Sequence, residues 1–272
     1  DQNQAPPVLG VIDPNVNRPY ASVSPLLRVV GTVESSGTLE YHALLVKFQR
    51  RFANGFSFLN AYTCGKTLDL ASDNDGLVTL TDIFHPDYNH GPALYDVTHT
   101  LSSSWIYELP FGRQSRLGGW QVNGIAYWRT GLPVTITQSG TMLSTGVADN
   151  RPDRIANGAA ADPAVEQWFD PNAFRQTTER TATFGNAGRG ILRGPGQFNV
   201  DLSITKLTRF GRAELELRAE AFNLLNHPQF ALPNSQLGSS GFGSITMMAG
   251  NPACASCGTT ERQIQLGAKL RF

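Results

Sequence analysis

The 272-residue sequence predicts an all-β fold built from about seven antiparallel strands. Apolar and polar residues alternate with a period of two in about seven segments, whereas helical periodicity is almost absent. The 27 glycines and 16 prolines suit short strands joined by turns and loops. No stretch approaches the roughly 18 consecutive apolar residues of a transmembrane helix. Only strands, which need a single apolar face, are left to cross a membrane.

The alternating segments place the predicted strands, in chain order, at residues 41–52, 56–66, 98–109, 120–128, 199–205, 213–221 and 263–272. Alternation is clearest in 213–221, where Leu215 and Leu217 oppose a charged face made of Glu214, Glu216, Arg218 and Glu220. Segment 263–272 alternates in the same way. Segments 98–109 and 120–128 carry aromatic residues near their ends, where the rings of membrane strands meet the lipid–water boundary.

The connections between these segments alternate in length. Short turns are predicted at residues 53–55, 110–119 and 208–212, and each is followed by a long loop, at residues 67–96, 139–198 and 226–260. Alternate connections of an antiparallel up-and-down sheet lie at opposite ends, so all the long loops project from one end. Outer-membrane barrels show this asymmetry. The sequence therefore predicts a segment of an antiparallel up-and-down transmembrane β-barrel, incomplete with about seven strands, that carries long extracellular loops.

A soluble β-sandwich is the alternative, because its strands also carry one polar face. In a barrel, four leucines (Leu215, Leu217, Leu266 and Leu270) lie exposed on the outer face, whereas in a sandwich they pack under a second sheet. In a barrel the charged face of 213–221 lines the lumen. A catalytic carboxylate pair is the competing interpretation, since successive residues on one face of a strand lie about 7 Å apart.

The last predicted strand ends in a pattern that favours the barrel. Gln265, Gly267, Leu270 and Phe272 follow the order polar, glycine, apolar, terminal aromatic, which resembles the assembly signal of bacterial outer-membrane barrels. We expect Phe272 to anchor at the periplasmic interface, Leu270 to face lipid, and Gly267 to allow close approach of the assembly machinery. In a soluble protein an exposed apolar strand would favour aggregation.

Several short phrases, in their order and spacing, resemble one family. They include Tyr41-His42-Ala43-Leu44, Asp96-Val97-Thr98-His99, Tyr107-Glu108-Leu109-Pro110-Phe111-Gly112, Leu192-Arg193-Gly194-Pro195-Gly196 and Arg218-Ala219-Glu220-Ala221-Phe222-Asn223. Over about residues 38–272 the chain resembles the C-terminal barrel half of TonB-dependent outer-membrane receptors of the Oar-like kind. Such receptors usually carry a carboxypeptidase-regulatory-like domain at the N-terminus.

The resemblance implies active uptake across the bacterial outer membrane. In such receptors about 22 strands close around a plug domain, and TonB acts on a short N-terminal box. Neither is recognised here, so residues 1–38 are interpreted as a loop or linker at a cut N-terminus, and residues 39–272 as C-terminal barrel strands and extracellular loops. The implied partners are outer-membrane lipid, the β-barrel assembly machinery and, through the missing N-terminal part, TonB. The substrate stays unidentified.

The net charge of zero gives no reason to expect nucleic acid as a partner, and we expect neither a cofactor nor enzyme activity. The alternative function is a secreted all-β binding module directed at carbohydrate. Porins and autotransporters are the other barrels considered.

Three cysteines and a histidine-rich loop are the remaining candidates for chemistry. Cys254 and Cys257 form a Cys-x-x-Cys pair, for which an oxidising compartment favours a disulfide. Free thiols and a metal site stay open, although the second ligand pair of a zinc site is lacking. Cys64 stands alone. The loop sequence from His85 to His90 resembles no tight chelate, so we assign no metal ligand.

Asp96 and His99 lie at a predicted strand start. No nucleophile or second carboxylate is placed beside them, so we expect them to hold the turn from loop to strand and assign no catalytic residue.

Overall fold

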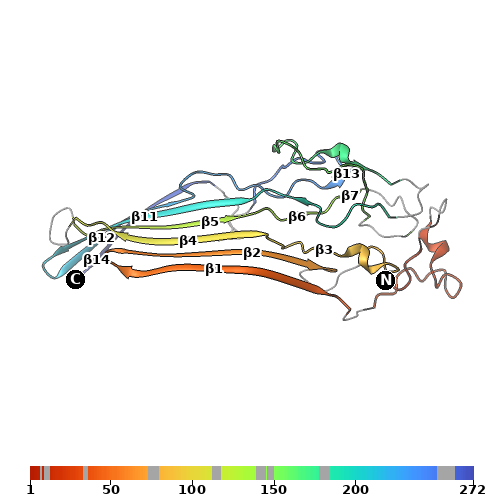
Figure 1. Cartoon of the computed structure of the whole chain (residues 1–272), viewed down its shortest axis with the longest axis horizontal. Coiled ribbons are helices and arrows are strands. Elements are labelled where there is room, and N and C mark those ends of the chain that lie inside the picture. The colour runs from red at the N-terminus through yellow and green to blue at the C-terminus, as the bar shows by residue number, and fades with distance from the viewer. Residues whose placement is uncertain are drawn as a thin grey trace.

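The structure is a computed structural model of the chain and describes residues 1–6, 8, 13–32, 36–72, 80–111, 118–138, 145, 150–177, 184–249 and 261–272. Its main feature is one open antiparallel sheet, called the wall below, in which neighbouring strands follow one another in chain order (Figure 1). The strands of the wall are β1 (Leu39–Ala53), β2 (Phe56–Asp69), β4 (His99–Glu108), β5 (Trp120–Arg129), β11 (Gln197–Phe210), β12 (Ala213–Phe222) and β14 (Gln263–Arg271), and the short β3 (Gly91–Pro92) pairs with β2.

The seven predicted strands correspond to the seven long strands, and the prediction of an all-β antiparallel meander is confirmed. Two strands extend well beyond their predicted bounds. Strand β2 continues to Asp69, where β3 pairs with it, and β11 runs from Gln197 to Phe210 instead of 199–205. The extension of β11 breaks the sequence alternation, because Lys206 lies among apolar neighbours. The backbone pairing with β12 nevertheless continues to Phe210.

The connections sort by length to the two ends of the wall, as predicted. The tight turns after β1 and β11 lie at one end, called the turn end, together with Phe272, and the long connections and the N-terminus lie at the other, called the loop end (Figure 1). At the turn after β1, Asn54 has φ 54° and Gly55 has φ 78°. Positive φ at both positions is typical of the two-residue turns whose twist matches that of paired strands.

The long connections form a loop cap with several very short elements. Strand β6 (Pro133–Val134) pairs with β10 (Leu192–Arg193), and β8 (Asp153–Arg154) pairs with β9 (Phe174–Arg175). Strand β7 (Thr137–Gln138) pairs in parallel with β13 (Gln236–Leu237). Three 3-10 helices, η1 (Pro14–Asn17), η2 (Pro86–Asn89) and η3 (Pro171–Ala173), also lie outside the wall. Among the described residues, no helix is long and apolar enough to span a membrane.

The hydrophobic core lies in the loop cap. It consists of Val134, Ile136, Phe169, Ala173, Phe174 and Leu192, with Trp168, Ile191, Leu237 and Phe242 packed against it. The ring of Phe169 packs edge-on against Phe242, with centroids 5.1 Å apart, and against Phe174 at 6.0 Å. None of the buried apolar side chains that the structure describes lies in the seven long strands.

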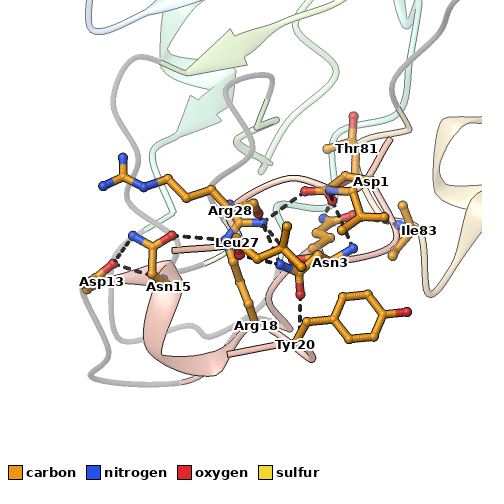
Figure 2. A network of polar contacts seen from close by, with 12 residues as sticks. Asp1, Asn3, Asp13, Asn15, Arg18, Tyr20, Leu27, Arg28, Thr81 and Ile83 are labelled. Atoms are coloured by element: carbon orange, nitrogen blue, oxygen red, sulfur yellow. Dashed lines mark hydrogen bonds and ion pairs between the residues drawn. The ribbon is translucent and has the colours of Figure 1, made fainter. Parts of the chain in front are cut away.

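The described part of residues 1–30 folds back on itself through a network of polar contacts (Figure 2). The buried side chain of Asn3 donates to the carbonyl of Leu27 at 2.8 Å, and the amide of Tyr20 donates to Asn3 at 2.9 Å. Arg18 forms an ion pair with Asp1 at 3.0 Å. The buried Gln4 donates to the carbonyl of Thr81 at 2.8 Å. This segment is therefore fastened to the connection between β2 and β3.

Candidate membrane-spanning wall and its loop cap

Strand register divides the side chains of the wall into two faces, one mainly apolar and the other mixed, with charged residues on β12 and β14 but also Leu45, Leu59, Ile106 and Ile125. Paired residues on neighbouring strands point to the same side, and residues two apart along a strand share that side. Leu44, for example, pairs with Cys64, and Leu202 pairs with Gly124 and Ala221. The apolar face so defined carries Leu44, Val46, Phe48, Phe56, Phe58, Tyr62, Leu101, Trp105, Tyr107, Trp120, Val122, Ala126, Trp128, Phe198, Val200, Leu202, Ile204, Leu215, Leu217, Ala219, Ile264, Leu266, Ala268 and Leu270.

No second sheet covers the apolar face in the part of the chain that the structure describes. Leu217, Leu266 and Leu270 are 45%, 78% and 59% exposed, and Leu215 is half-buried. Withdrawing a Leu side chain from water stabilises a protein by about 1.5–3 kcal/mol, so a face of this composition is unfavourable in water and favourable in hydrocarbon. The sandwich alternative required these leucines to pack under protein, and the structure places them in the open.

Aromatic side chains gather at the two ends of the apolar face. Near the turn end, Phe56 lies 5.6 Å from Phe58 and 5.9 Å from Tyr107 between ring centroids. There the Lys206 ammonium also lies 4.6 Å from the ring of Trp120. Near the loop end, His99 stacks between Tyr62 and Trp128, and its Nδ1 lies 2.8 Å from the Tyr62 hydroxyl.

The spacing of these aromatic groups suits a bilayer. Trp120 and Trp128 lie eight residues apart on one face of β5, which is about 27 Å along a strand. At the usual tilt of roughly 35–45° this corresponds to about 20 Å across the membrane, close to the apolar band of roughly 25 Å in outer-membrane barrels. Between them, the indole of Trp105 lies over Gly124, where any Cβ would clash with the ring.

The opposite, polar face carries the residues that the sequence assigns to the lumen. Glu214 lies 2.9 Å from Arg271 and 3.2 Å from Arg209. Glu216 lies 2.7 Å from Arg218, and Glu220 lies 3.6 Å from the same guanidinium. The ion pairs connect β11, β12 and β14 near the turn end. Three carboxylates and three guanidinium groups therefore compensate one another on the polar face.

The residues of the predicted assembly signal all lie on or just beyond β14. Gln265 and Gly267 belong to the polar face, where they pair with Glu220 and Arg218, and Leu270 belongs to the apolar face. Phe272 is fully exposed at the turn end. Gln265 and Gly267 therefore lie on one face of β14 and Leu270 on the other. Their role in barrel assembly stays a prediction.

Two buried aspartates fasten the loop cap to the wall, and sequence reasoning missed their arginine partners. Asp69, at the end of β2, forms an ion pair with Arg189, which also donates to the carbonyl of Gly91 at 3.0 Å. Asp96 accepts a hydrogen bond from the amide of Thr67 at 2.6 Å and forms an ion pair with Arg193. Both carboxylates are only 1% exposed. Asp96 therefore holds the loop-to-strand junction, as expected, but through Arg193 and the strand backbone and not through His99.

A third arginine, Arg151, also links the connection that follows β2 to the connection between β5 and β11. The guanidinium of Arg151 lies 3.7 Å from the centre of the Tyr88 ring and donates to the Tyr88 carbonyl, while the Tyr88 hydroxyl donates to the Gly185 carbonyl at 2.7 Å. Burial raises the pKa of Tyr88, and the nearby positive charge of Arg151 opposes that shift in part. Cation–π contact and hydrogen bonding together hold η2 against the connection between β5 and β11.

The remaining candidates for chemistry are dispersed. His85 Nδ1 lies 2.9 Å from Asp82, and no group of three or more metal-binding side chains occurs among the residues that the structure describes. His227 exchanges hydrogen bonds with Asn223 in the turn that follows β12. Cys64 is a free thiol on the apolar face. Cys254 and Cys257 lie outside the described residues, so their predicted disulfide stays untested.

Comparison with known proteins places this wall in a family. Residues 1–265 match a family described as an outer membrane beta barrel domain. The chain belongs to this family. Searches of curated proteins and of solved structures gave no significant match. Membership implies an outer-membrane location in bacteria, and an uncovered apolar face is what such a location predicts.

Proposed function

We propose that this outer-membrane barrel domain is part of a TonB-dependent receptor that imports a substrate actively. The observation that carries the proposal is the open wall with a compensated charged face. Barrels of about eight strands fill their interior with side chains, whereas about 22 strands enclose a lumen large enough for a plug domain. Strands β1 and β14 are not paired with each other, so these seven strands suit an arc of a large barrel.

The loop cap supports the same proposal. Its own hydrophobic core and its buried Asp69 and Asp96 ion pairs give the loop end a defined surface. A preorganised surface suits capture of a substrate, because ordering mobile loops at binding would reduce affinity. The resemblance noted in the sequence, of the Oar-like kind, provides the link to TonB.

The polar face supports a role in transport over a role in catalysis. Glu214, Glu216 and Glu220 are all ion-paired with arginines, whereas a catalytic acid requires a carboxyl group that is free to hold and release its proton. We therefore propose that these residues line the lumen and that the protein is not an enzyme. The further partners of this proposal are the β-barrel assembly machinery and TonB.

The proposal is tested by producing the complete receptor of which this domain is proposed to be part in the outer membrane of hosts with and without TonB. Growth is compared on defined carbon, iron and peptide sources, and the purified protein is examined in planar bilayers in KCl. We expect at least one source whose use requires both the protein and TonB, together with a closed, non-conducting state in the bilayer. Steady conductance and uptake that does not depend on TonB would instead identify a porin and refute the proposal.

A further inference from the structure

Arg129 is the last residue of β5 and lies at the loop end of the wall. It belongs to the polar face, because it follows Trp128 of the apolar face and successive residues of a strand point to opposite sides. Arg129 is half-buried, and its guanidinium group forms no hydrogen bond or ion pair with another residue in the part of the chain that the structure describes. Within that part, it is a positive charge without a counter-ion.

The neighbours of Arg129 on the polar face are uncharged groups that form hydrogen bonds. They are its two register partners, Thr100 of β4 and Gln197 of β11, and, two residues toward the turn end, Tyr127 with its own partners Ser102 and Asn199. Paired residues have Cβ atoms about 5 Å apart, and residues two apart along a strand lie about 7 Å apart. A ligand on Arg129 would therefore also meet hydroxyl groups, amide groups and one aromatic ring.

Gln197 has hydrogen-bonding capacity that the chain does not use. It is only 9% exposed, and its Oε1 atom is buried without a hydrogen-bond partner among the described residues. A buried acceptor without a donor is unfavourable. The unsatisfied amide and the unpaired guanidinium group of Arg129 lie side by side on two paired strands, and one polar ligand could satisfy both.

The nearby carboxylates are already engaged by other groups. Asp201 lies four residues beyond Gln197 on β11, which is about 13 Å along the strand, and it accepts a hydrogen bond from the Asn199 side chain at 2.9 Å. Asp96 is ion-paired with another arginine, and so are the glutamates of β12 near the turn end. A negative charge that matches Arg129 would therefore come from a bound molecule.

The chemistry of the position favours a carboxylate. The planar guanidinium group binds a carboxylate through two parallel hydrogen bonds with charge assistance. One arginine balances the single negative charge of a carboxylate, whereas a phosphate monoester carries nearly two. The hydroxyl and amide groups around Arg129 would hold the polar body of the same ligand, and the ring of Tyr127 offers it a flat surface.

We propose that Arg129 binds a carboxylate group of the substrate at the loop end of the lumen. The inference rests on the proposed function, because it requires the polar face to line the lumen of a receptor. It adds the chemical class of the substrate, which is a polar molecule with a carboxylate group. Acidic sugars and the C-terminus of a peptide both provide this group.

Equilibrium binding to the complete receptor, purified in detergent and followed by calorimetry, tests the proposal. The probes are two matched pairs: trigalacturonate with its methyl ester, and trialanine with its C-terminal amide. We expect wild type to bind the carboxylate form of at least one pair about tenfold more tightly than the neutral form, the effect of a charge-assisted contact. The pair that shows this preference identifies the source of the carboxylate. Arg129→Gln should abolish the preference.

The matched control is Lys269→Gln, which removes the same charge from the polar face of β14 near the turn end and should keep the preference. Absence of a preference in both pairs with wild type overturns the inference, and so does an equal loss in the two variants. Displacement of the probe by millimolar inorganic phosphate would identify a site for any small anion and would also overturn it.

A conservative variant covers the case in which Arg129→Gln fails to fold, as judged by its migration in unheated gels. Arg129→Lys keeps the charge but loses the paired hydrogen bonds, so the preference should shrink without vanishing, and an unchanged preference would count against the inference. Binding is measured without TonB. A carboxylate preference without TonB-dependent uptake would therefore refute only the proposed transport, and TonB-dependent uptake without the preference would refute only the role of Arg129.

Discussion

A single charged substitution on the apolar face gives the sharpest test of the wall's orientation. Leu202, in the middle of β11, pairs with Gly124 and Ala221. It lies four residues from Phe198, which pairs with Trp128 at the loop end, and four from Lys206, whose ammonium contacts Trp120 at the turn end. The next residue along β11, Ser203, belongs to the polar face. Leu202→Arg and Ser203→Arg therefore place the same charge at the same depth on opposite sides.

The expected magnitudes follow from the position of Leu202. Four residues span about 13 Å along a strand, and a tilt of roughly 35–45° reduces this to about 10 Å of depth. Leu202 thus lies near the bilayer midplane, where an arginine facing lipid costs about 2–4 kcal/mol. Ser203 pairs with Glu220, so an arginine there gains a carboxylate neighbour, and we expect a change within about 0.5 kcal/mol.

Equilibrium unfolding in guanidinium chloride measures both variants. The protein is reconstituted in phosphatidylcholine vesicles, and tryptophan fluorescence follows the transition. If Leu202 faced water, the arginine would be neutral or stabilising, because it would replace an exposed apolar group. Equal free energies of unfolding for the two variants, or a larger loss for Ser203→Arg, would refute the assignment of the faces.

Three further outcomes follow from the loop cap and the apolar face. Asp69→Ala leaves the buried Arg189 unpaired and should lower the stability of the cap by about 3–5 kcal/mol. The loss is measured as reduced hydrogen-exchange protection in residues 184–193. Asp162→Ala, at an exposed aspartate, is the control and should leave that protection unchanged. Tyr88, whose pKa is raised by burial, should ionise above the ordinary value of 10.0. Its folded form holds the proton more tightly, so its contribution to stability is complete below pH 10 and is lost as the pH rises through the folded pKa; a phenolate absorbance titration that gives an unshifted pKa would contradict this. With Cys254 and Cys257 changed to Ser, Cys64 should react with a lipid-soluble maleimide and resist a membrane-impermeant one, and equal labelling would place its thiol in water.

The strand positions and the alternation of short turns with long loops were predictable from sequence, because both depend on local patterns. Segment 213–221 alternates cleanly, and β12 covers Ala213–Phe222. In segment 56–66 the sequence alternation alone does not decide which side chains share a face. Pairing decides it, since Tyr62 lies between Val46 and Leu101 on the apolar face. The predicted strand ends at residue 205 because Lys206 interrupts the apolar alternation. Its ammonium contacts the ring of Trp120, an arrangement typical of a lysine at a membrane boundary.

The loop cap was not predictable from sequence, for a physical reason. Strands of two residues, such as β6 and β10, are too short to show an apolar–polar alternation in the sequence. They also pair with each other although about sixty residues separate them along the chain. Arg189 and Arg193 lie more than ninety residues from the aspartates that they bind. Local sequence patterns contain no information about such contacts, so the sequence alone does not connect these arginines with the aspartates.

The distribution of burial follows from the two solvents that the chain meets. Within the wall, neighbouring strands satisfy the backbone hydrogen bonds, and in the proposed membrane placement lipid would take the place of a protein core for the apolar side chains. The loop cap lies in water, so it must bury its own apolar groups around Phe169 and neutralise Asp69 and Asp96 with arginines. The two parts are therefore stabilised by different interactions. Leu202→Arg should destabilise the wall, and Asp69→Ala should loosen the cap while the wall stays folded. Loss of both parts together in either variant would show that the cap and the wall form one cooperative unit.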